Sequence, residues 1–312
     1  MAGVGVLIVA PGDDLHARGV RSELARRGAS VEWVDIAQLD RATALTEVID
    51  QGGSDALLRP REGAPIQLSQ VDTIWWRRGG QPAAGEDLDE ISREFVRQEW
   101  RHFIAGLEAV STRSRWVTPL AANTRADRKS FGLATAAELG LRIPRTAITN
   151  DPAAVRELVD QGDPLIYKRL GATAPALATM PVGEADLERL ETLPNCPAIF
   201  QERIDAQLDI RVTAIGSELF AAEIESQAGD GALDWRLDHS VPFRPHSLDP
   251  EVGDRLRELM ARLELLYGAI DLRLTPEGEY VFLEVNPSGQ FLFVELLAGI
   301  PLTERLAGFL AG

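Results

Sequence analysis

The sequence predicts an α/β protein with a parallel sheet in its N-terminal part and an antiparallel hairpin near its C-terminus. Residues 4–10 form a continuous apolar run, which is typical of a buried strand. Residues 15–27 have the apolar spacing of an amphipathic helix, and residues 30–34 predict a second strand. A strand, a helix and a strand in this order favour parallel pairing. Residues 268–285 contain two apolar strands around a short turn.

The remaining elements follow in order along the chain. Residues 71–76 predict another buried strand, and residues 129–139 predict a helix closed by Gly140. A long charged helix, a short strand and an apolar C-terminal helix are predicted at 87–110, 116–119 and 302–310. Between residues 121 and 200 we expect two or three helices and a few strands. We expect three units: an N-terminal α/β domain over 1–120, a central subdomain over 121–200 and a C-terminal subdomain over 201–312.

Composition excludes several classes of protein. The 312 residues suffice for two or three units, and the net charge of -16 argues against nucleic acid as the main partner, because phosphate backbones need a basic face. The single cysteine excludes an intrachain disulfide and a cysteine-based zinc site. No apolar run reaches transmembrane length and the N-terminus lacks a signal-peptide pattern, so we expect a cytoplasmic protein without a membrane partner.

Three oxygen-bearing side chains converge on the predicted hairpin. Side chains alternate along a strand, so Glu284 and Asn286 share one face, and the hairpin folds Asp271 back beside them. Two carboxylates and a carboxamide suit Mg²⁺, which prefers oxygen ligands and completes its shell with water and substrate phosphates. The spacing and the apolar flanks favour a site for Mg-ATP over a hairpin with scattered polar residues.

The only two lysines of the chain support this interpretation. Arginine predominates through genomic bias, but a lysine is a compact point charge that arginine does not mimic at a tight phosphate site. Lys168 ends an apolar run that predicts a buried strand, where an ammonium group needs an anionic partner. Lys129 begins the helix predicted at 129–139. Both lysines precede the Asp/Glu/Asn set, an order suited to a nucleoside triphosphate.

The order of these residues resembles that of the ATP-grasp ligases over about residues 120–312. The resemblance implies that Lys129 and Lys168 contact the phosphates and the adenine edge of ATP, and that Asp271, Glu284 and Asn286 hold Mg²⁺. It implies that a strand-end segment is the hinge that binds adenine through backbone groups. That segment consists of Gln201, Glu202, Arg203 and Ile204.

The same resemblance assigns three further residues. Asp209 matches an acidic residue near the ribose, Arg211 faces the acyl-phosphate region and Arg236 matches a phosphate-contacting arginine. The loop after Lys168, residues 171–175, departs from the family because it is poor in Gly and Ser.

The resemblance extends to the graspetide synthetases, the microviridin-type peptide maturases, and then spans nearly the whole chain. Its signature is EVNPSGQFLFVE at 284–295, with similar segments at 12–17, 75–78, 224–227 and 234–236. These enzymes phosphorylate an Asp or Glu of a ribosomal precursor peptide and capture it with Thr or Ser as a lactone, or with Lys as a lactam. The resemblance implies ATP and Mg²⁺ as cofactors, a leader-plus-core peptide as partner, and leader binding in a groove near residues 223–237. A homodimer fits, because related enzymes are often dimers.

Two roles have competing interpretations. Arg211 is our candidate for stabilising the tetrahedral oxyanion, a role that its motif position favours. The alternative is a salt bridge to Asp209, two residues away on the same strand. Arg77 and Arg78 end a strand of the N-terminal sheet, where open α/β sheets place ligands, so they could hold core carboxylates. The alternative for this arginine pair is interdomain salt bridges. No histidine lies in the motif blocks, so no general base is identified.

Other functions are weighed against peptide cyclisation. A glutamate-tailing or free-amino-acid ligase would usually carry Asn-x-x-Pro-Gly-Leu after the metal set, which this chain lacks. A non-catalytic peptide-binding homologue is disfavoured by the complete Asp/Glu/Asn set and both lysines. A dinucleotide-binding Rossmann domain is rejected, because the loop at 10–15 lacks the Gly-x-Gly-x-x-Gly pattern and its acids would repel a pyrophosphate.

Overall fold

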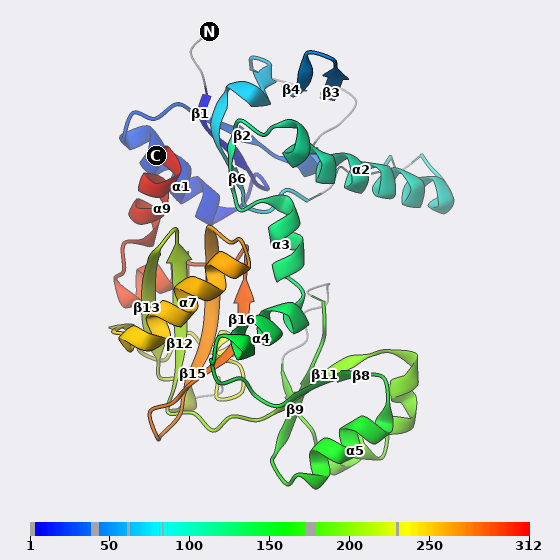
Figure 1. Ribbon diagram of the computed structural model, residues 1–312, viewed down its shortest axis with the longest axis vertical. Helices are drawn as coiled ribbons and strands as arrows, with labels where there is room; N and C mark the ends of the chain where they lie inside the picture. Colours follow the sequence, from blue (N-terminus) through cyan, green and yellow to red (C-terminus); the bar gives the residue numbers. More distant parts are fainter. Residues whose placement is uncertain are drawn as a thin grey trace.

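The computed structural model describes residues 4–38, 44–60, 63–80, 82, 84–85, 87–171, 179–228 and 231–312. The elements are stacked along the long axis of the molecule (Figure 1). The N-terminal sheet lies at one end, the five-stranded C-terminal sheet lies in the middle, and a small sheet with α5 (Pro152–Asp160) lies at the other end. Among the described residues, no helix is long and apolar enough to cross a membrane.

The N-terminal sheet is parallel, with strand order β2-β1-β6-β7. Its strands are β1 (Val4–Val9), β2 (Val31–Val34), β6 (Val71–Trp76) and β7 (Arg115–Val117). Helix α1 (Leu15–Arg26) joins β1 to β2 and begins where the Asp14 carboxylate caps the amide of Ala17. It ends at Arg26, and Gly28 follows the cap with a φ of 75°, a left-handed conformation that suits glycine. The β-α-β prediction is confirmed.

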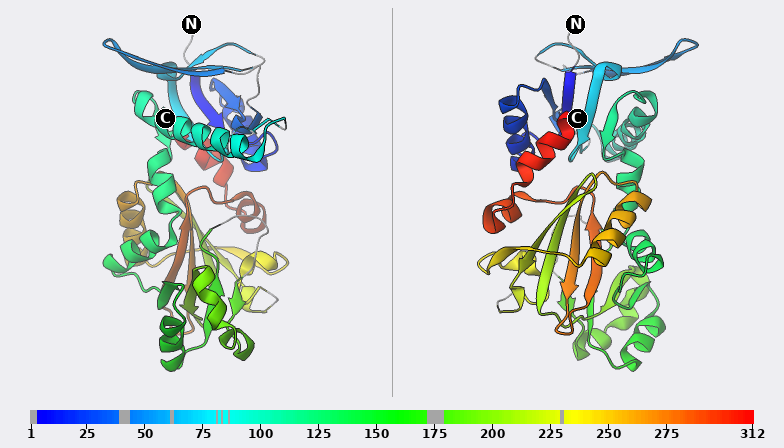
Figure 2. Two further views of the ribbon diagram at one scale, coloured as in Figure 1. Left: turned by 90° about the vertical axis from the view of Figure 1, so that its right-hand side faces the viewer. Right: turned by 60° about the vertical axis from the view of Figure 1, so that its left-hand side comes forward.

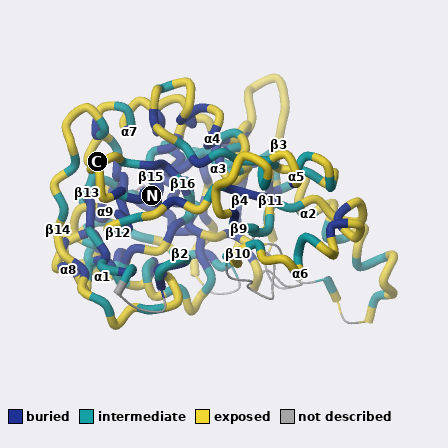
Figure 3. The backbone as a smooth tube through the Cα atoms, turned by 90° about the horizontal axis from the view of Figure 1, so that it is seen from below, coloured by how far each residue is buried: buried dark blue, intermediate teal, exposed yellow. Residues whose placement is uncertain are grey.

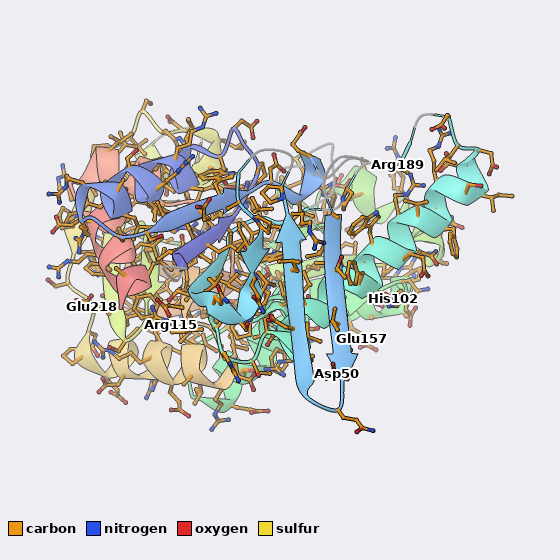
Figure 4. The ribbon with its side chains drawn as sticks, turned by 90° about the horizontal axis from the view of Figure 1, so that it is seen from above. Asp50, His102, Arg115, Glu157, Arg189 and Glu218 are labelled. Atoms are coloured by element: carbon orange, nitrogen blue, oxygen red, sulfur yellow. The ribbon has the colours of Figure 1, made fainter. Side chains whose placement is uncertain are left out.

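A second, antiparallel sheet projects from this unit. It has the order β3-β4-β5, with β3 (Ala44–Asp50), β4 (Gly53–Arg59) and β5 (Ile66–Gln67). Figure 2 shows the β3–β4 hairpin extending away from the body, and Figure 4 shows Asp50 at its tip. Helix α2 (Glu90–Val110) runs beneath it. The predicted start of this helix at residue 87 is wrong by three residues, because Asp89 caps the amide of Ser92.

The region 121–200 contains more helix than predicted. It holds α3 (Leu120–Ala126), α4 (Lys129–Glu138), α5 and the one-turn α6 (Glu184–Leu187). The prediction of two or three helices omitted the shortest helices, which have too few residues to show a helical hydrophobic period. An antiparallel sheet of order β10-β9-β11-β8 comprises Met180–Pro181, Leu165–Lys168, Ala198–Glu202 and Thr146–Thr149.

The C-terminal sheet is antiparallel, with order β14-β13-β12-β15-β16. Its strands are Phe243–His246, Glu218–Ile224, Leu208–Ile215, Tyr267–Leu274 and Tyr280–Asn286. Alternate residues such as Val212 and Ile270 pack against α4 and α7 (Pro250–Arg262). Figure 3 shows these central strands as mainly buried. The residues of β12 and β15 that point to the opposite face of the sheet include charged side chains, and the candidate site lies on this face.

The chain then returns to the N-terminal unit. Helix α8 (Leu292–Ala298) follows β16, and α9 (Leu302–Ala311) packs against α1. Leu302, Leu306 and Leu310 are buried in a core shared with β1. The apolar C-terminal helix is therefore an intramolecular element that ties the two ends of the chain together, as Figure 1 shows.

Candidate active site

A cavity of about 540 Å³ lies between β9 and the charged face of the C-terminal sheet. Half of the residues predicted for the site line it. They are Lys129, Lys168, Asp209, Arg236, Asp271, Glu284 and Asn286. The other predicted residues, Gln201 to Ile204, Arg211, Arg77 and Arg78, are not among its lining residues. Residues 172–175 of the loop after Lys168 lie outside the described residues.

The predicted hairpin forms, with an irregularity at the site itself. Asp271 pairs with Glu284, whereas Leu272 pairs with Phe282, so β16 contains one extra residue at this point. Such a bulge re-aims the side chains next to it. Leu283 therefore lines the same cavity as Glu284 and Asn286 instead of pointing to the opposite face. The strand alternation used for the prediction holds for Glu284 and Asn286 and fails one residue earlier.

The three proposed metal ligands are in contact. Asn286 Nδ2 lies 3.2 Å from Glu284 Oε1 and 3.4 Å from Asp271 Oδ2. Lys129 Nζ donates to the other oxygen of Glu284. Lys129 begins α4, and this helix packs beside β16. Sequence positions 129 and 284 thus meet only because the helix docks on the hairpin strand.

The electrostatics of this cluster follow from burial and from the excess of cations. Burial by itself raises the pKa of Glu284, but Lys129 and Lys168 outweigh it and lower the pKa to about 2. Burial lowers the pKa of Lys168 to about 8, despite attraction to Glu284. Burial raises the pKa of Asp271, against the opposing effect of Arg211. The Glu284 carboxylate is thus ionised at neutral pH, and the pKa of Lys168 lies only slightly above neutral pH.

Arg211 is bound to Asp271 and not to Asp209. Its Nη1 lies 2.9 Å from both oxygens of Asp271, the residue opposite it on β15. Its Nη2 donates to the carbonyl of Gln290, and its guanidinium carbon lies 5.6 Å from the ring centroid of Trp235. The alternative of a salt bridge within β12 is wrong, because cross-strand neighbours lie closer than residues two apart along a strand. The oxyanion role of Arg211 stays a prediction.

Asp209 forms its ion pair with a residue on the neighbouring strand β15. Arg273, its neighbour on β15, donates from Nε to Asp209 Oδ1 at 3.1 Å. Arg273 also donates to the carbonyls of Ile204 and Ala232, at 2.8 and 2.6 Å. Ser226 donates to the other oxygen of Asp209. Asp209 thus belongs to an internal hydrogen-bond network with Arg273 and Ser226, and its ribose role stays a prediction.

Arg273 was not among the predicted site residues, although its position in the sequence indicated the face on which it lies. It follows Asp271 by two residues on β15, so strand alternation places it on the same face. Arg236 is held by Asp234, with Nε and Nη2 each 2.6 Å from a carboxylate oxygen. The hydrogen bonds that Arg236 donates to the Asp234 carboxylate raise the pKa of Arg236. Its Nη1 lies 3.9 Å from Glu284, which leaves a cation aimed at the metal set.

The predicted hinge lies at the end of β11. Gln201 is buried and donates to Thr146 Oγ1 at 2.8 Å, and Ile204 is buried with its carbonyl bound to Arg273. Backbone amides of Glu202 and Arg203 donate to the carbonyls of Arg145 and Pro164. These bonds hold the segment in place, and its contact with adenine stays a prediction.

The two arginines after β6 have different surroundings. Arg77 is 1% exposed, its Nε lies 3.6 Å from Asp14, and its Nη1 donates to the carbonyl of Ser288 in the C-terminal part of the chain. Arg78 is exposed. The geometry of Arg77 favours the interdomain alternative over contact with a substrate carboxylate. For Arg78 the substrate role stays a prediction.

The residues present fit a divalent cation of the Mg²⁺ type. The described residues contain no group of three or more His, Cys, Asp or Glu side chains placed to hold a metal. Asp271, Glu284 and Asn286 instead offer two carboxylates and a carboxamide in mutual contact. A hard ion that keeps waters and takes phosphate oxygens needs few protein ligands of this kind.

Comparison with solved structures shows the family. One similar structure is the macrocyclase MdnC of Microcystis aeruginosa MRC, bound with precursor peptide MdnA. The two sequences are 30% identical, and the match covers 98% of this chain and 99% of MdnC, with a TM-score of 0.87. The chain belongs to the graspetide synthetase family of ATP-grasp ligases. No protein-family model and no curated protein matched the sequence.

Two further structures agree with this assignment. The macrocyclase MdnB of the same organism is 32% identical over 99% of both chains, with a TM-score of 0.82. A RiPP-associated ATP-grasp ligase of Chryseobacterium gregarium, in complex with ADP and a leader and core peptide, is 26% identical over 98% of this chain and 96% of its own, with a TM-score of 0.86. The α/β prediction and the ATP-grasp fold with its N-terminal parallel-sheet domain are confirmed, and the protein is an ATP-grasp ligase.

Proposed function

We propose that this enzyme uses ATP and Mg²⁺ to join side chains within a ribosomally made precursor peptide. The observation that carries the proposal is the end-to-end similarity, at 30% identity, to a macrocyclase bound with its precursor peptide. The cavity with its two lysines and its Asp/Glu/Asn set supports it. The partner is a leader-plus-core peptide, and the leader binds near residues 223–237.

The reaction has two steps. A free carboxylate acylates poorly because its leaving group would be oxide. Transfer of the γ-phosphoryl group of ATP to an Asp or Glu oxygen of the core releases ADP and forms an acyl phosphate. A Thr or Ser hydroxyl, or a Lys amine, then attacks the carbonyl carbon and loses its proton, and inorganic phosphate leaves with the former carboxylate oxygen. The product is a lactone or a lactam, and the peptide has lost one water.

Phosphoryl transfer asks the protein mainly for positioning and for neutralisation of charge. Lys129 and Lys168, on two sides of the cavity, bind the phosphates, and Arg236 adds a cation that Asp234 orients. Asp271, Glu284 and Asn286 hold Mg²⁺, which supplies charge neutralisation at the phosphoryl oxygens. Gln201 to Ile204 form the adenine hinge and Asp209 lies toward the ribose.

Arg211 acts next to these groups. It holds Asp271 in place through both carboxylate oxygens and faces the acyl-phosphate region. Arg78, which is exposed at the end of β6, meets core carboxylates, while Arg77 supports the contact between units.

The division into units at about residues 120 and 200 is part of this proposal, as is a cytoplasmic location. A homodimer is also part of it. Leu296 and Leu297 of α8 are 80% and 44% exposed, whereas the other apolar residues of α8 pack inside the chain. An exposed pair of this kind is suited to a contact with a second copy.

The test is turnover of the precursor peptide encoded next to the enzyme, with Mg²⁺ and ATP, followed by mass spectrometry of the peptide. We expect the loss of one or more waters, and reversal by alkaline hydrolysis identifies esters. Glu284→Gln is expected to abolish the loss. Glu277→Gln is the matched control, because Glu277 is exposed in the turn of the same hairpin.

Three results would contradict the proposal. A gain of amino-acid mass on the peptide would indicate a tailing or free-amino-acid ligase. Water loss that persists in Glu284→Gln would remove Glu284 from the metal site. An absence of nucleotide binding would leave a peptide-binding homologue.

A further inference from the structure

Residues 287–292, which directly follow Asn286, are held by an unusual set of contacts. Three consecutive carbonyl oxygens each accept a hydrogen bond from a different side chain. Arg77 Nη1 donates to Ser288 O, the Tyr267 hydroxyl donates to Gly289 O at 2.7 Å, and Arg211 Nη2 donates to Gln290 O at 3.0 Å. We refer to Arg77, Tyr267 and Arg211 as the carbonyl clamp.

The N-terminal unit contributes further contacts to the same segment. His16 Nδ1 accepts from the amides of Phe291 and Leu292, at 3.3 and 3.2 Å, which requires a neutral imidazole nitrogen. Outside that unit, Asn123 of α3 donates from Nδ2 to Ser288 Oγ at 3.2 Å. Figure 1 shows the N-terminal sheet directly above the end of the C-terminal sheet where this segment runs. The segment is therefore one of the contacts between the two units, beside the packing of α9 on α1.

The clamped segment is joined to the metal set by a tight turn. The amide of Gly289 donates to the carbonyl of Asn286 at 3.1 Å. A Cβ at Gly289 would lie 2.2 Å from the Cβ of Ala269, the residue paired with Asn286 across the hairpin. The turn thus lies flat against β15, and a movement of residues 288–290 moves Asn286.

The burial of Arg77 makes a purely stabilising role of this residue a poor explanation. Arg77 and Tyr267 are both 1% exposed. Arg77 Nε and Nη2 have no hydrogen-bond partner among the described residues, and its nearest carboxylate, on Asp14, lies 3.6 Å away. A buried, incompletely paired guanidinium costs more free energy than an apolar side chain of the same volume. Among the described residues, the guanidinium of Arg77 makes one hydrogen bond, to the carbonyl of Ser288.

We propose that Arg77 and Tyr267 are positioning residues that fix the Asn286 carboxamide for metal binding through residues 287–290. The proposal rests on the metal role proposed above for Asn286. It assigns to the N-terminal unit a direct effect on metal affinity, exerted by Arg77 from the end of β6. Arg211 has the same effect and in addition holds Asp271, so it is less suited to a test.

The test compares two tyrosines of one hairpin. Tyr267→Phe removes the hydroxyl that holds Gly289, whereas Tyr280→Phe removes a hydroxyl at the far end of the hairpin, 2.7 Å from His246 Nε2. Binding of Mn²⁺, as a probe for Mg²⁺, is measured by electron paramagnetic resonance in the presence of a non-hydrolysable ATP analogue. Binding of the analogue without metal and the unfolding temperature are measured on the same samples.

We expect Tyr267→Phe to raise the dissociation constant for Mn²⁺ about fivefold, the effect of one hydrogen bond, with metal-free analogue binding unchanged. Tyr280→Phe is expected to leave both constants unchanged. Arg77→Met should weaken Mn²⁺ binding like Tyr267→Phe, and Arg77→Lys, which keeps a donor, should restore part of it.

The outcomes separate this proposal from the proposed function. Unchanged Mn²⁺ affinity in both Tyr267→Phe and Arg77→Met would overturn the positioning role alone. Equal losses in Tyr267→Phe and Tyr280→Phe would also overturn it, because the effect would then follow general destabilisation. An absence of Mn²⁺ binding in the unaltered enzyme would overturn the metal role of Asn286 together with this inference.

Discussion

Arg211 Nη1 lies 2.9 Å from each carboxylate oxygen of Asp271, and both side chains are nearly excluded from solvent. The two residues face each other across β12 and β15. Within this pair the Arg211 cation opposes the burial that raises the pKa of Asp271, the carboxylate that we propose as a Mg²⁺ ligand. Four of the predictions below concern groups that surround this pair.

The Arg211–Asp271 pair should matter strongly for stability. Arg211→Met leaves the Asp271 carboxylate buried without its main partner, and we expect a loss of about 3–5 kcal/mol in the free energy of unfolding. Urea denaturation measures it. Arg305→Met is the control, since this arginine is 53% exposed and lies 4.0 Å from its partner Glu218, and its effect should stay below about 0.5 kcal/mol. A loss of similar size in both variants would contradict the assignment.

Nucleotide binding should take up protons at mildly alkaline pH. The pKa of Lys168 is about 8 in the free protein because burial disfavours the ammonium, and a bound triphosphate favours it. At pH 8 about half of the lysine is neutral, so we expect uptake of about half a proton on binding and almost none at pH 6. Calorimetry in buffers of different ionisation enthalpy measures the uptake. Lys168→Arg, always charged, should abolish it, and persistence in that variant would exclude Lys168 as its source.

Glu284 should contribute to the acid sensitivity of the fold. Its pKa is lowered from 4.5 to about 2 in the folded protein, because the two lysines outweigh burial. A carboxyl with a depressed pKa stabilises the fold above its unfolded pKa, and this contribution is lost as pH falls through the folded value. Between pH 5 and pH 2, Glu284→Gln should therefore lose less stability than the unaltered enzyme, as judged from urea midpoints. Equal slopes in the two proteins would be inconsistent with this coupling.

Asp209 offers a choice between a ribose contact and a structural ion pair. Its bonds with Arg273 and Ser226 lead us to expect that Asp209→Asn lowers the free energy of unfolding by about 3 kcal/mol. Discrimination between ATP and 2′-deoxy-ATP, measured by calorimetry, should change only if Asp209 also contacts the ribose. A stable Asp209→Asn protein that has lost this discrimination would favour the ribose role alone.

Gly289 should be intolerant of any side chain. Alanine there would place a Cβ 2.2 Å from that of Ala269 and 3.0 Å from Arg211 Nη2, so the turn must shift. We expect a loss of about 1–3 kcal/mol and weaker metal binding. Gly253→Ala, inside α7, meets Arg257 at an ordinary 3.6 Å and should stabilise the helix by up to about 1 kcal/mol. Thermal unfolding compares the two, and a harmless Gly289→Ala would show that the turn has room to adjust.

Local patterns in the sequence determined the elements and much of the candidate site. The apolar runs of β1 and β6, the capped helix after Asp14 and the hairpin before Asn286 all depend on neighbours within a few residues, and each formed as predicted within about three residues. Alternation on a strand brought Glu284 and Asn286 to one face for the same reason. The rarity of lysine and its point charge singled out Lys129 and Lys168, which line the same cavity, and the resemblance to ATP-grasp enzymes assigned them to ATP.

Tertiary structure decided which charges pair and which residues hold the site together. Arg211 forms its ion pair with Asp271 and not with Asp209, because the register of β12 and β15 places Arg211 opposite Asp271. No local rule in the sequence specifies this register. The ion pair of Asp209 with Arg273 and the clamp contacts of Arg77 and Tyr267 likewise join residues from 22 to 211 positions apart. The bulge at Leu283 inserts one residue that spacing does not reveal. Composition and period describe one element at a time, whereas these contacts exist only where separate elements pack against each other.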